Sequence, residues 1–112
     1  MAFGSDWPVS TPNPWLELEV AVTRATPGGD PGRVLHPEQR IDLQAALAAF
    51  TRGSAYVNHD DDAGSIEEGK RADLVVLDRN PFEDGPIGET RTVMTLASGT
   101  VVYEAGSSRP VA

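Results

Sequence analysis

The sequence predicts an α+β fold, with helices in the first half of the chain and strands in the second. Two observations support this prediction. Over residues 1–59, apolar side chains recur at helical spacing between capping signals and glycine-rich turns. From Asp60 onward, short runs rich in β-branched residues alternate with turn sequences. The 112 residues are enough for one domain of modest size.

A first helix is predicted over residues 15–23. Asn13 is a favoured N-cap residue, and Pro14 suits the first helical position. The run TPGGDPG at residues 26–32 ends the helix. The apolar residues that share one face of this helix are Trp15, Leu18 and Val22.

A second helix is predicted to begin at Pro37, with Glu38 in the first turn, where an acid suits the helix dipole. Gly53 provides a natural C-terminal stop. Residues 54–58 are expected to add one short helical turn. The apolar residues on the predicted buried face are Leu43, Ala46, Leu47 and Phe50.

Strands are predicted in the second half of the chain. Residues 72–78, ADLVVLD, are apolar on both faces, a pattern typical of a strand that is covered on both sides. Residues 92–97 and 100–103 are β-prone and flank the pair Ser98-Gly99. Two such runs joined by two turn residues predict a tight hairpin.

The predicted hairpin has a definite register. Leu96 is expected to face Val101, and Met94 is expected to face Tyr103. Apolar and aromatic pairs of this kind stabilise neighbouring antiparallel strands.

Charge and composition exclude several classes of function. The formal net charge is −8, from 17 acidic and nine basic residues, whereas nucleic acids and anionic membrane surfaces require a basic surface. No apolar run approaches the roughly 20 residues of a membrane helix, and no signal segment opens the sequence. Cysteine is absent, which excludes disulfides and thiolate metal sites. We therefore predict a cytoplasmic protein with neither a nucleic-acid nor a membrane partner.

The acidic run at residues 60–62 does not match a calcium loop. A loop of the EF-hand type requires Gly at its sixth position and Glu at its twelfth. Counting from Asn58 places Ala63 sixth and Gly69 twelfth. We interpret the run as a solvated loop.

The two histidines and the single lysine also lack a chemical motif. His36 and His59 have no second histidine or acid at metal-ligand spacing, and His36 directly precedes the predicted helix start. Lys70 lies between Gly69 and Arg71 in a predicted exposed turn. Spacing alone therefore assigns no function.

The stretch FGSDWPVS, residues 3–10, resembles the end of a buried strand that carries one carboxylate, Asp6, into a turn. On the residues alone, Asp6 is interpreted as a turn residue that bonds to its own backbone. A chain that opens in this way suggests that a preceding part is missing.

A longer pattern, IEEGKRADLVVLDRNPF at residues 66–82, resembles the C-terminal signature of the amidohydrolase superfamily. The hairpin ASGTVVYE, residues 97–104, is similar to the closing strand of that family. FGSDWPVS resembles the end of the eighth barrel strand in amidohydrolase family 3, the branch related to N-substituted formamide deformylases. Together these motifs cover residues 3–104. The positions that match the signature are Gly64, Ile66, Gly69, Lys70, Ala72, Asp73 and Asp78.

The resemblance implies a fold for each part of the chain. Residues 1–59 would be the last strand-helix unit of a TIM barrel, which needs about 250 residues when complete. Residues 60–106 would be strands of the family's small composite β-sandwich domain, and residues 107–112 a flexible tail. The chain would then be a C-terminal fragment.

The resemblance also implies a chemistry. Asp6 would be both a catalytic residue and a metal ligand, taking the proton from the attacking water. The full-length enzyme would use a divalent metal, zinc, to hydrolyse a non-peptide C–N bond in a small amide or cyclic amide. One aspartate cannot hold a catalytic zinc, which normally takes three protein ligands. The isolated chain is therefore expected to bind no metal and to be inactive. The alternative is a stand-alone module, structural or for interaction, without catalysis.

Apolar faces of the predicted elements suggest self-association. Residues 72–78 and the hairpin at 92–103 carry apolar residues that a missing partner would cover, and unpaired strand edges can pair with another chain. We predict a homo-oligomer, specifically a symmetric dimer, whose contact uses a strand edge and the apolar stripe of the first helix.

Overall fold

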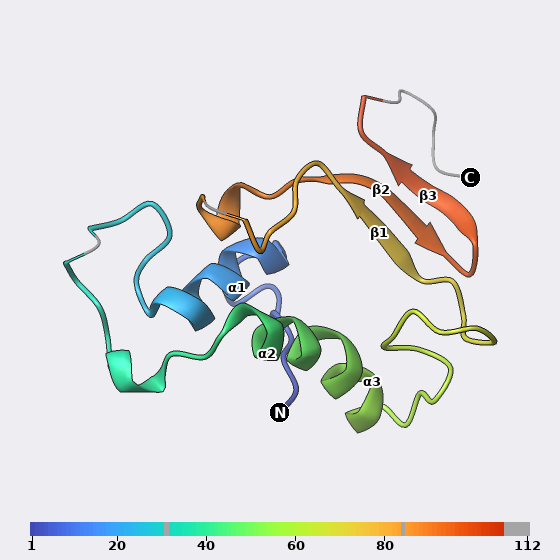
Figure 1. Ribbon diagram of the computed structural model, residues 1–112, viewed down its shortest axis with the longest axis horizontal. Coiled ribbons are helices and arrows are strands. Elements are labelled where there is room, and N and C mark those ends of the chain that lie inside the picture. The colour runs from blue at the N-terminus through green and yellow to red at the C-terminus, as the bar shows by residue number, and fades with distance from the viewer. Residues whose placement is uncertain (31, 84, 107–112) are drawn as a thin grey trace.

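The computed structural model describes residues 1–30, 32–83 and 85–106, with helices first and strands last (Figure 1). The predicted α+β class is confirmed, and the predicted tail at 107–112 lies outside the described residues. None of the described helices has the length and apolar character needed to cross a membrane. The helical elements are α1 (Pro14–Thr23), a 3-10 turn (Pro37–Gln39), α2 (Leu43–Ala48), a π turn (Ala49–Gly53), α3 (Ser54–Val57) and a second 3-10 turn (Ile87–Glu89). The strands are β1 (Leu74–Leu77), β2 (Thr92–Ala97) and β3 (Thr100–Glu104).

Helix α1 forms as predicted. The Asn13 side chain accepts a hydrogen bond of 3.0 Å from the Trp15 N–H, which satisfies one of the free donors at the helix start. At the other end Arg24 adopts a left-handed backbone, and its N–H donates to the Val20 carbonyl. A capped start and a left-handed end therefore set the limits of α1.

The predicted start of the second helix at Pro37 is wrong. Pro37 begins only a single 3-10 turn, after which Arg40 is extended. The α-helix begins at Leu43 because the Asp42 side chain accepts the Ala45 N–H at 2.7 Å. An N-cap aspartate thus determines the start in place of the earlier proline.

The predicted stop at Gly53 is also wrong. Gly53 has a helical φ of −64°, so the chain continues through the π turn into α3, which is the short extra turn that the sequence predicts. A glycine ends a helix by adopting a left-handed φ. Gly53 serves another purpose, because the N-terminal segment lies directly against it.

The three strands form one antiparallel sheet in the order β1-β2-β3. Ser98 and Gly99 both have positive φ and make the predicted tight turn, and Leu96 pairs with Val101 as predicted. The pairing of Met94 with Tyr103 is wrong. The register shifts after this point, which places Thr95 opposite Tyr103.

The described chain leaves side chains exposed on both faces of the sheet. Val75 in β1 is 54% exposed, and Val76 next to it is about half exposed. The expectation of a strand covered on both sides is therefore not met by the described residues. One edge of β1 and one edge of β3 have no neighbouring strand among the described residues.

The core lies between α1 and α2. Trp15, Leu18 and Ala46 are buried there. Phe3 from the N-terminal segment, Leu77 from β1 and Ile87 from the second 3-10 turn contribute to the same cluster. The stripe of α1 is thus largely buried inside the chain, so its predicted use as a contact between two copies is wrong.

Candidate functional site

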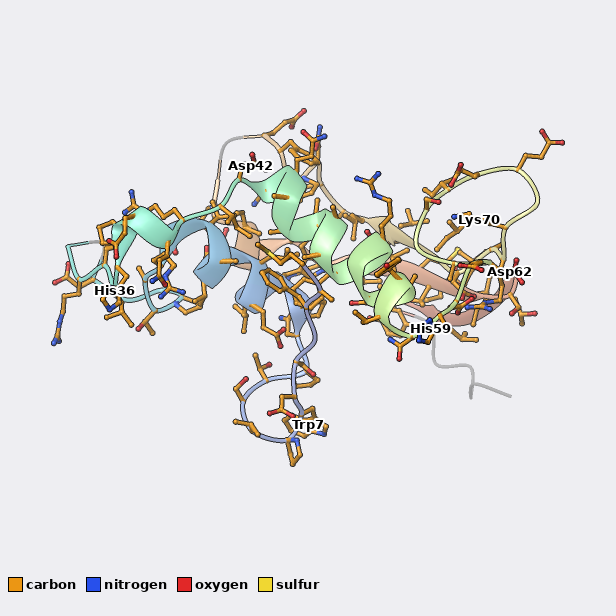
Figure 2. The ribbon with its side chains drawn as sticks, turned by 90° about the horizontal axis from the view of Figure 1, so that it is seen from below. Trp7, His36, Asp42, His59, Asp62 and Lys70 are labelled. Carbon is orange, nitrogen blue, oxygen red and sulfur yellow. The ribbon has the colours of Figure 1, made fainter. Side chains whose placement is uncertain are left out.

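Asp6 lies in an exposed loop that precedes α1. Figure 2 shows this loop, marked by Trp7, extending away from the rest of the molecule. Residues 1–6 belong to none of the described strands. Asp6 has a left-handed backbone with a φ of 52°, and its carbonyl accepts the Val9 N–H at 2.9 Å.

The side chain of Asp6 does not make the expected turn bond. The Trp7 N–H bonds instead to the Ser5 hydroxyl at 3.2 Å. Among the described residues, no hydrogen bond or ion pair involves the Asp6 carboxylate. The carboxylate is therefore free to contact a ligand or a partner group.

Other metal-binding side chains do not converge on Asp6. His36 lies at one end of the molecule and His59 and Asp62 at the other, while the loop with Trp7 is separate from both (Figure 2). The described part of the chain contains no cluster of three or more histidine, cysteine, aspartate or glutamate residues that could hold a metal ion. These residues do not make a metal site by themselves.

The N-terminal segment is held by the second helical region. The Phe3 N–H donates to the Ala49 carbonyl at 3.0 Å, and the Ser54 hydroxyl donates to the Phe3 carbonyl at 2.6 Å. The rings of Phe3 and Phe50 meet edge to face, with centroids 5.5 Å apart. These contacts fix the chain three residues before Asp6.

The signature segment contains an ion-pair network that the sequence did not reveal. The Arg71 guanidinium bonds to Asp60 at 2.7 Å and to Asp73 at 2.6 Å. Asp73 also accepts the Ser98 N–H at 2.8 Å, and the Gly99 N–H donates to the Ala72 carbonyl. The signature therefore connects the end of the helical region to the turn of the hairpin, which is a structural role.

The network lowers the pKa of both aspartates. The bond from Arg71 is the main cause for Asp60, whereas the Ser98 N–H contributes most for Asp73, followed by Arg71. In both cases the charged form gains partners in the folded chain.

Lys70 is held within its turn, which corrects the expectation of an exposed lysine. Its ammonium group donates to the Ser65 hydroxyl at 2.8 Å and pairs with Glu67 at 3.1 Å. Hydrogen bonds from Ser65 and Lys70 lower the pKa of Glu67. Gly64, in the same loop, has a φ of 91°, and a Cβ there would lie 2.8 Å from the Ala55 Cβ. The loop thus packs closely on α3.

Arg71→Gln is expected to flatten the acid dependence of stability. The two aspartates have pKa values in the folded chain below the ordinary value of about 3.9, which holds in the unfolded chain. At a pH between the folded and the unfolded pKa, the unfolded chain therefore binds more protons than the folded chain. The stability that the two aspartates contribute is fully present above their unfolded pKa and is lost as the pH falls through their folded pKa. Without Arg71, thermal unfolding followed from pH 6 down to about pH 2 should show a smaller acid loss.

Arg33→Gln is the matched control, because it makes the same charge change in an exposed loop. If this variant flattened the profile as much as Arg71→Gln does, net charge and not the network would control acid stability.

Comparison with known proteins gives a consistent result. The sequence profile described as "Amidohydrolase family" matches residues 1–103. N-substituted formamide deformylase of Arthrobacter pascens is 35% identical over 107 residues, which cover 93% of this chain and 19% of that protein. Protein LONG AFTER FAR-RED 3 of Arabidopsis thaliana is 38% identical over 107 residues, covering 92% of this chain and 18% of that protein.

A solved structure is also similar. A crystal structure of a triazine hydrolase variant superposes with a TM-score of 0.54 at 30% identity, covering 80% of this chain and 21% of that one. The chain thus spans about a fifth of the length of the relatives that it matches.

Proposed function

The chain belongs to the amidohydrolase family, and from that premise we propose that it supplies part of a metal-dependent amidohydrolase acting on a non-peptide C–N bond. The profile match over residues 1–103 carries this proposal. Two similar proteins, a formamide deformylase and a triazine hydrolase, bear the names of C–N hydrolases. The substrate class that we propose is a small amide or cyclic amide.

The proposed architecture follows the same premise. Residues 1–59 would complete a TIM barrel, and residues 60–106 would contribute strands to a small β-domain. The observation in favour is the change from helices to an antiparallel sheet within the described chain. We place this enzyme in the cytoplasm.

We assign Asp6 the role of general base. Its exposed carboxylate has no bonding partner among the described residues, so it is free to take a proton from the attacking water. The water oxygen bonds to the substrate carbon, the C–N bond breaks, and the proton passes to the departing nitrogen. An amide side chain at this position could not accept that proton.

The enzyme is proposed to use a divalent metal, zinc, as a Lewis acid. The described residues do not form a metal site alone. Asp6 is the ligand that we assign to this chain, and the remaining ligands would come from outside residues 1–112. This division follows from the three protein ligands that catalytic zinc normally takes.

The 112-residue chain alone is expected to have no amidase activity and to retain no stoichiometric zinc at neutral pH. The reason is the incomplete ligand set around Asp6. The chain would be dialysed against zinc and then against metal-free buffer, and analysed for bound metal and for hydrolysis of simple formamides. Retention of about one zinc ion per chain would contradict this expectation, because catalytic zinc usually needs three protein ligands.

A non-catalytic module is the second candidate function, favoured by one observation. Helix α1 buries Trp15 and Leu18 within the chain itself, with Ile87 from the sheet half in the same core. A chain that covers its own helix in this way could exist as a separate module. Full-length activity and its dependence on Asp6 distinguish the two candidates.

We also propose that the chain forms a symmetric dimer through its sheet. Val75, Val101 and Tyr103 are about half exposed, and the outer strand edges have no partner among the described residues. Analytical ultracentrifugation at micromolar concentration should therefore detect a dimer.

Val75→Lys should weaken this dimer, because it places a charge at an exposed apolar position of the sheet. Tyr56→Lys is the matched control, since Tyr56 is 82% exposed on α3 and belongs to no strand of the sheet. A monomeric wild-type chain with dispersed NMR signals would contradict the proposal.

A further inference from the structure

We propose that Ser54 and Gly53 are positioning residues that place the Asp6 carboxylate for its reaction. The inference rests on the proposed function, because Asp6 must be the base for its placement to matter. We call the Ala49 carbonyl, Gly53 and Ser54 the clamp, since they surround the backbone of Phe3 and the residues before it.

The clamp satisfies both backbone polar groups of Phe3 from one helical region. The Phe3 N–H donates to the Ala49 carbonyl at 3.0 Å, and the Phe3 carbonyl accepts the Ser54 hydroxyl at 2.6 Å. The Ser54 hydroxyl also lies 3.1 Å from the Ala49 carbonyl. A hydroxyl has one proton, so its shorter bond to Phe3 is the main one.

The Ala49 carbonyl can accept a bond from outside the helix because a carbonyl oxygen has two lone pairs, and it lies where the helix changes to a π turn. In an ordinary α-helix each carbonyl accepts the N–H four residues later. The π turn Ala49–Gly53 shifts this pattern by one residue, and Ala49 stands at its first position. Turns of this kind are rare and occur frequently at functional sites.

Gly53 makes room for the segment. A Cβ at position 53 would overlap the Met1 carbonyl oxygen and lie 3.2 Å from the Ala2 Cα. Real Cβ atoms essentially never come within 3.0 Å of another heavy atom in this way, so the contact with Met1 alone would force a shift. Because Gly53 has a helical φ, alanine would suit the helix but would displace the segment.

The clamp is close enough to control Asp6. Only Gly4 and Ser5 lie between Phe3 and Asp6. The loop beyond is closed by the bonds from Trp7 to Ser5 and from Val9 to Asp6. Since the loop extends away from the molecule, its direction depends on how its two ends are held, by the clamp and by the start of α1 (Figure 2).

The first experiment measures the clamp directly in the 112-residue chain. Ser54→Ala is expected to accelerate hydrogen exchange of the Phe3 amide about fivefold to tenfold, the effect of losing one hydrogen bond. Gly53→Ala should do the same by displacing the segment. Thr51→Val is the matched control, because among the described residues the Thr51 hydroxyl bonds only within the helix, to the Leu47 carbonyl. It should leave the Phe3 amide protected.

The second experiment measures catalysis in a full-length amidohydrolase that contains this chain. Ser54→Ala and Gly53→Ala should lower kcat up to about 10²-fold with little change in KM, because misplacement of a reacting group by about 1 Å has that effect. Ser54→Thr, which keeps a hydroxyl, should restore most of kcat. Thr51→Val should not change it.

The outcomes separate the two proposals. If Asp6→Asn loses turnover while Ser54→Ala and Gly53→Ala keep wild-type kcat, positioning by the clamp is wrong and the proposed function stands. If Asp6→Asn keeps normal turnover, the assignment of Asp6 as the base is wrong, and positioning for catalysis falls with it. Equal losses in Thr51→Val and Ser54→Ala would also overturn the proposal, because the effect would then come from the helix.

Discussion

Asp6→Asn in a full-length amidohydrolase that contains this chain is expected to lower kcat by about 10²- to 10⁴-fold, the usual contribution of a general base. The amide has the shape of the carboxylate but cannot take the proton from water. The fold should be unchanged, because Asp6 is exposed and its side chain has no bonding partner among the described residues. Steady-state kinetics and circular dichroism of the same preparation measure the two effects.

Asp62→Asn is the matched control for this variant. It makes the same chemical change in an exposed loop on a different part of the molecule (Figure 2). We expect it to keep wild-type kcat. Near-normal turnover in Asp6→Asn would return Asp6 to the role of a turn residue and would overturn its assignment as the general base.

Leu18→Ala is expected to lower the free energy of unfolding by about 2–5 kcal/mol, the range for removing a large side chain from a packed core. Leu18 is only 2% exposed and lies with Trp15 and Ala46 at the centre of the core. Small domains have about 5–15 kcal/mol of stability in total. The variant should therefore lose a large share of its stability and unfold at a lower urea concentration than the wild-type chain, as urea titration followed by circular dichroism would show.

Val20→Ala on the same helix provides the comparison for Leu18→Ala. Val20 is 36% exposed and lies outside the core cluster, so less buried contact is lost than at Leu18, and alanine suits a helix at least as well as valine. Its unfolding midpoint should stay close to that of the wild-type chain. Equal destabilisation by both substitutions would show that the core between α1 and α2 does not control stability.

Elements with strong local signals could be predicted from the sequence. The pair Asn13-Pro14 gave the start of α1, and Ser98-Gly99 gave the tight turn of the hairpin, because each acts through its own backbone. The shift in register beyond Leu96 was missed. A bulge depends on twist and packing in the formed sheet, which the turn alone does not determine.

Gly53 shows why the second helix was predicted less well. From the sequence it resembles a helix stop, since glycine readily adopts a left-handed φ. In the structure Gly53 is helical. Because it has no side chain, Met1 and Ala2 at the start of the sequence can lie directly against it. The role of this glycine depends on a tertiary contact that no local pattern contains.

The candidate site depended on resemblance more than on spacing. Asp6 was assigned through the family motif, whereas its freedom from the expected turn bond is visible only in the structure. The Arg71 network was missed because its partners Asp60 and Asp73 have the spacing of ordinary surface charges. Only the folded chain brings them together with the hairpin turn.

The hydrogen bond between Ser54 and Phe3 has a consequence for biosynthesis. It joins residues 51 positions apart, and ribosomes add about 5–20 residues per second. The segment with Asp6 is therefore synthesised seconds before the helical region that holds it. Asp6 reaches its final position only after residues 43–57 have folded. A substitution that slows this helical region would delay the assembly of the site on the nascent chain, even where the finished protein is identical in structure.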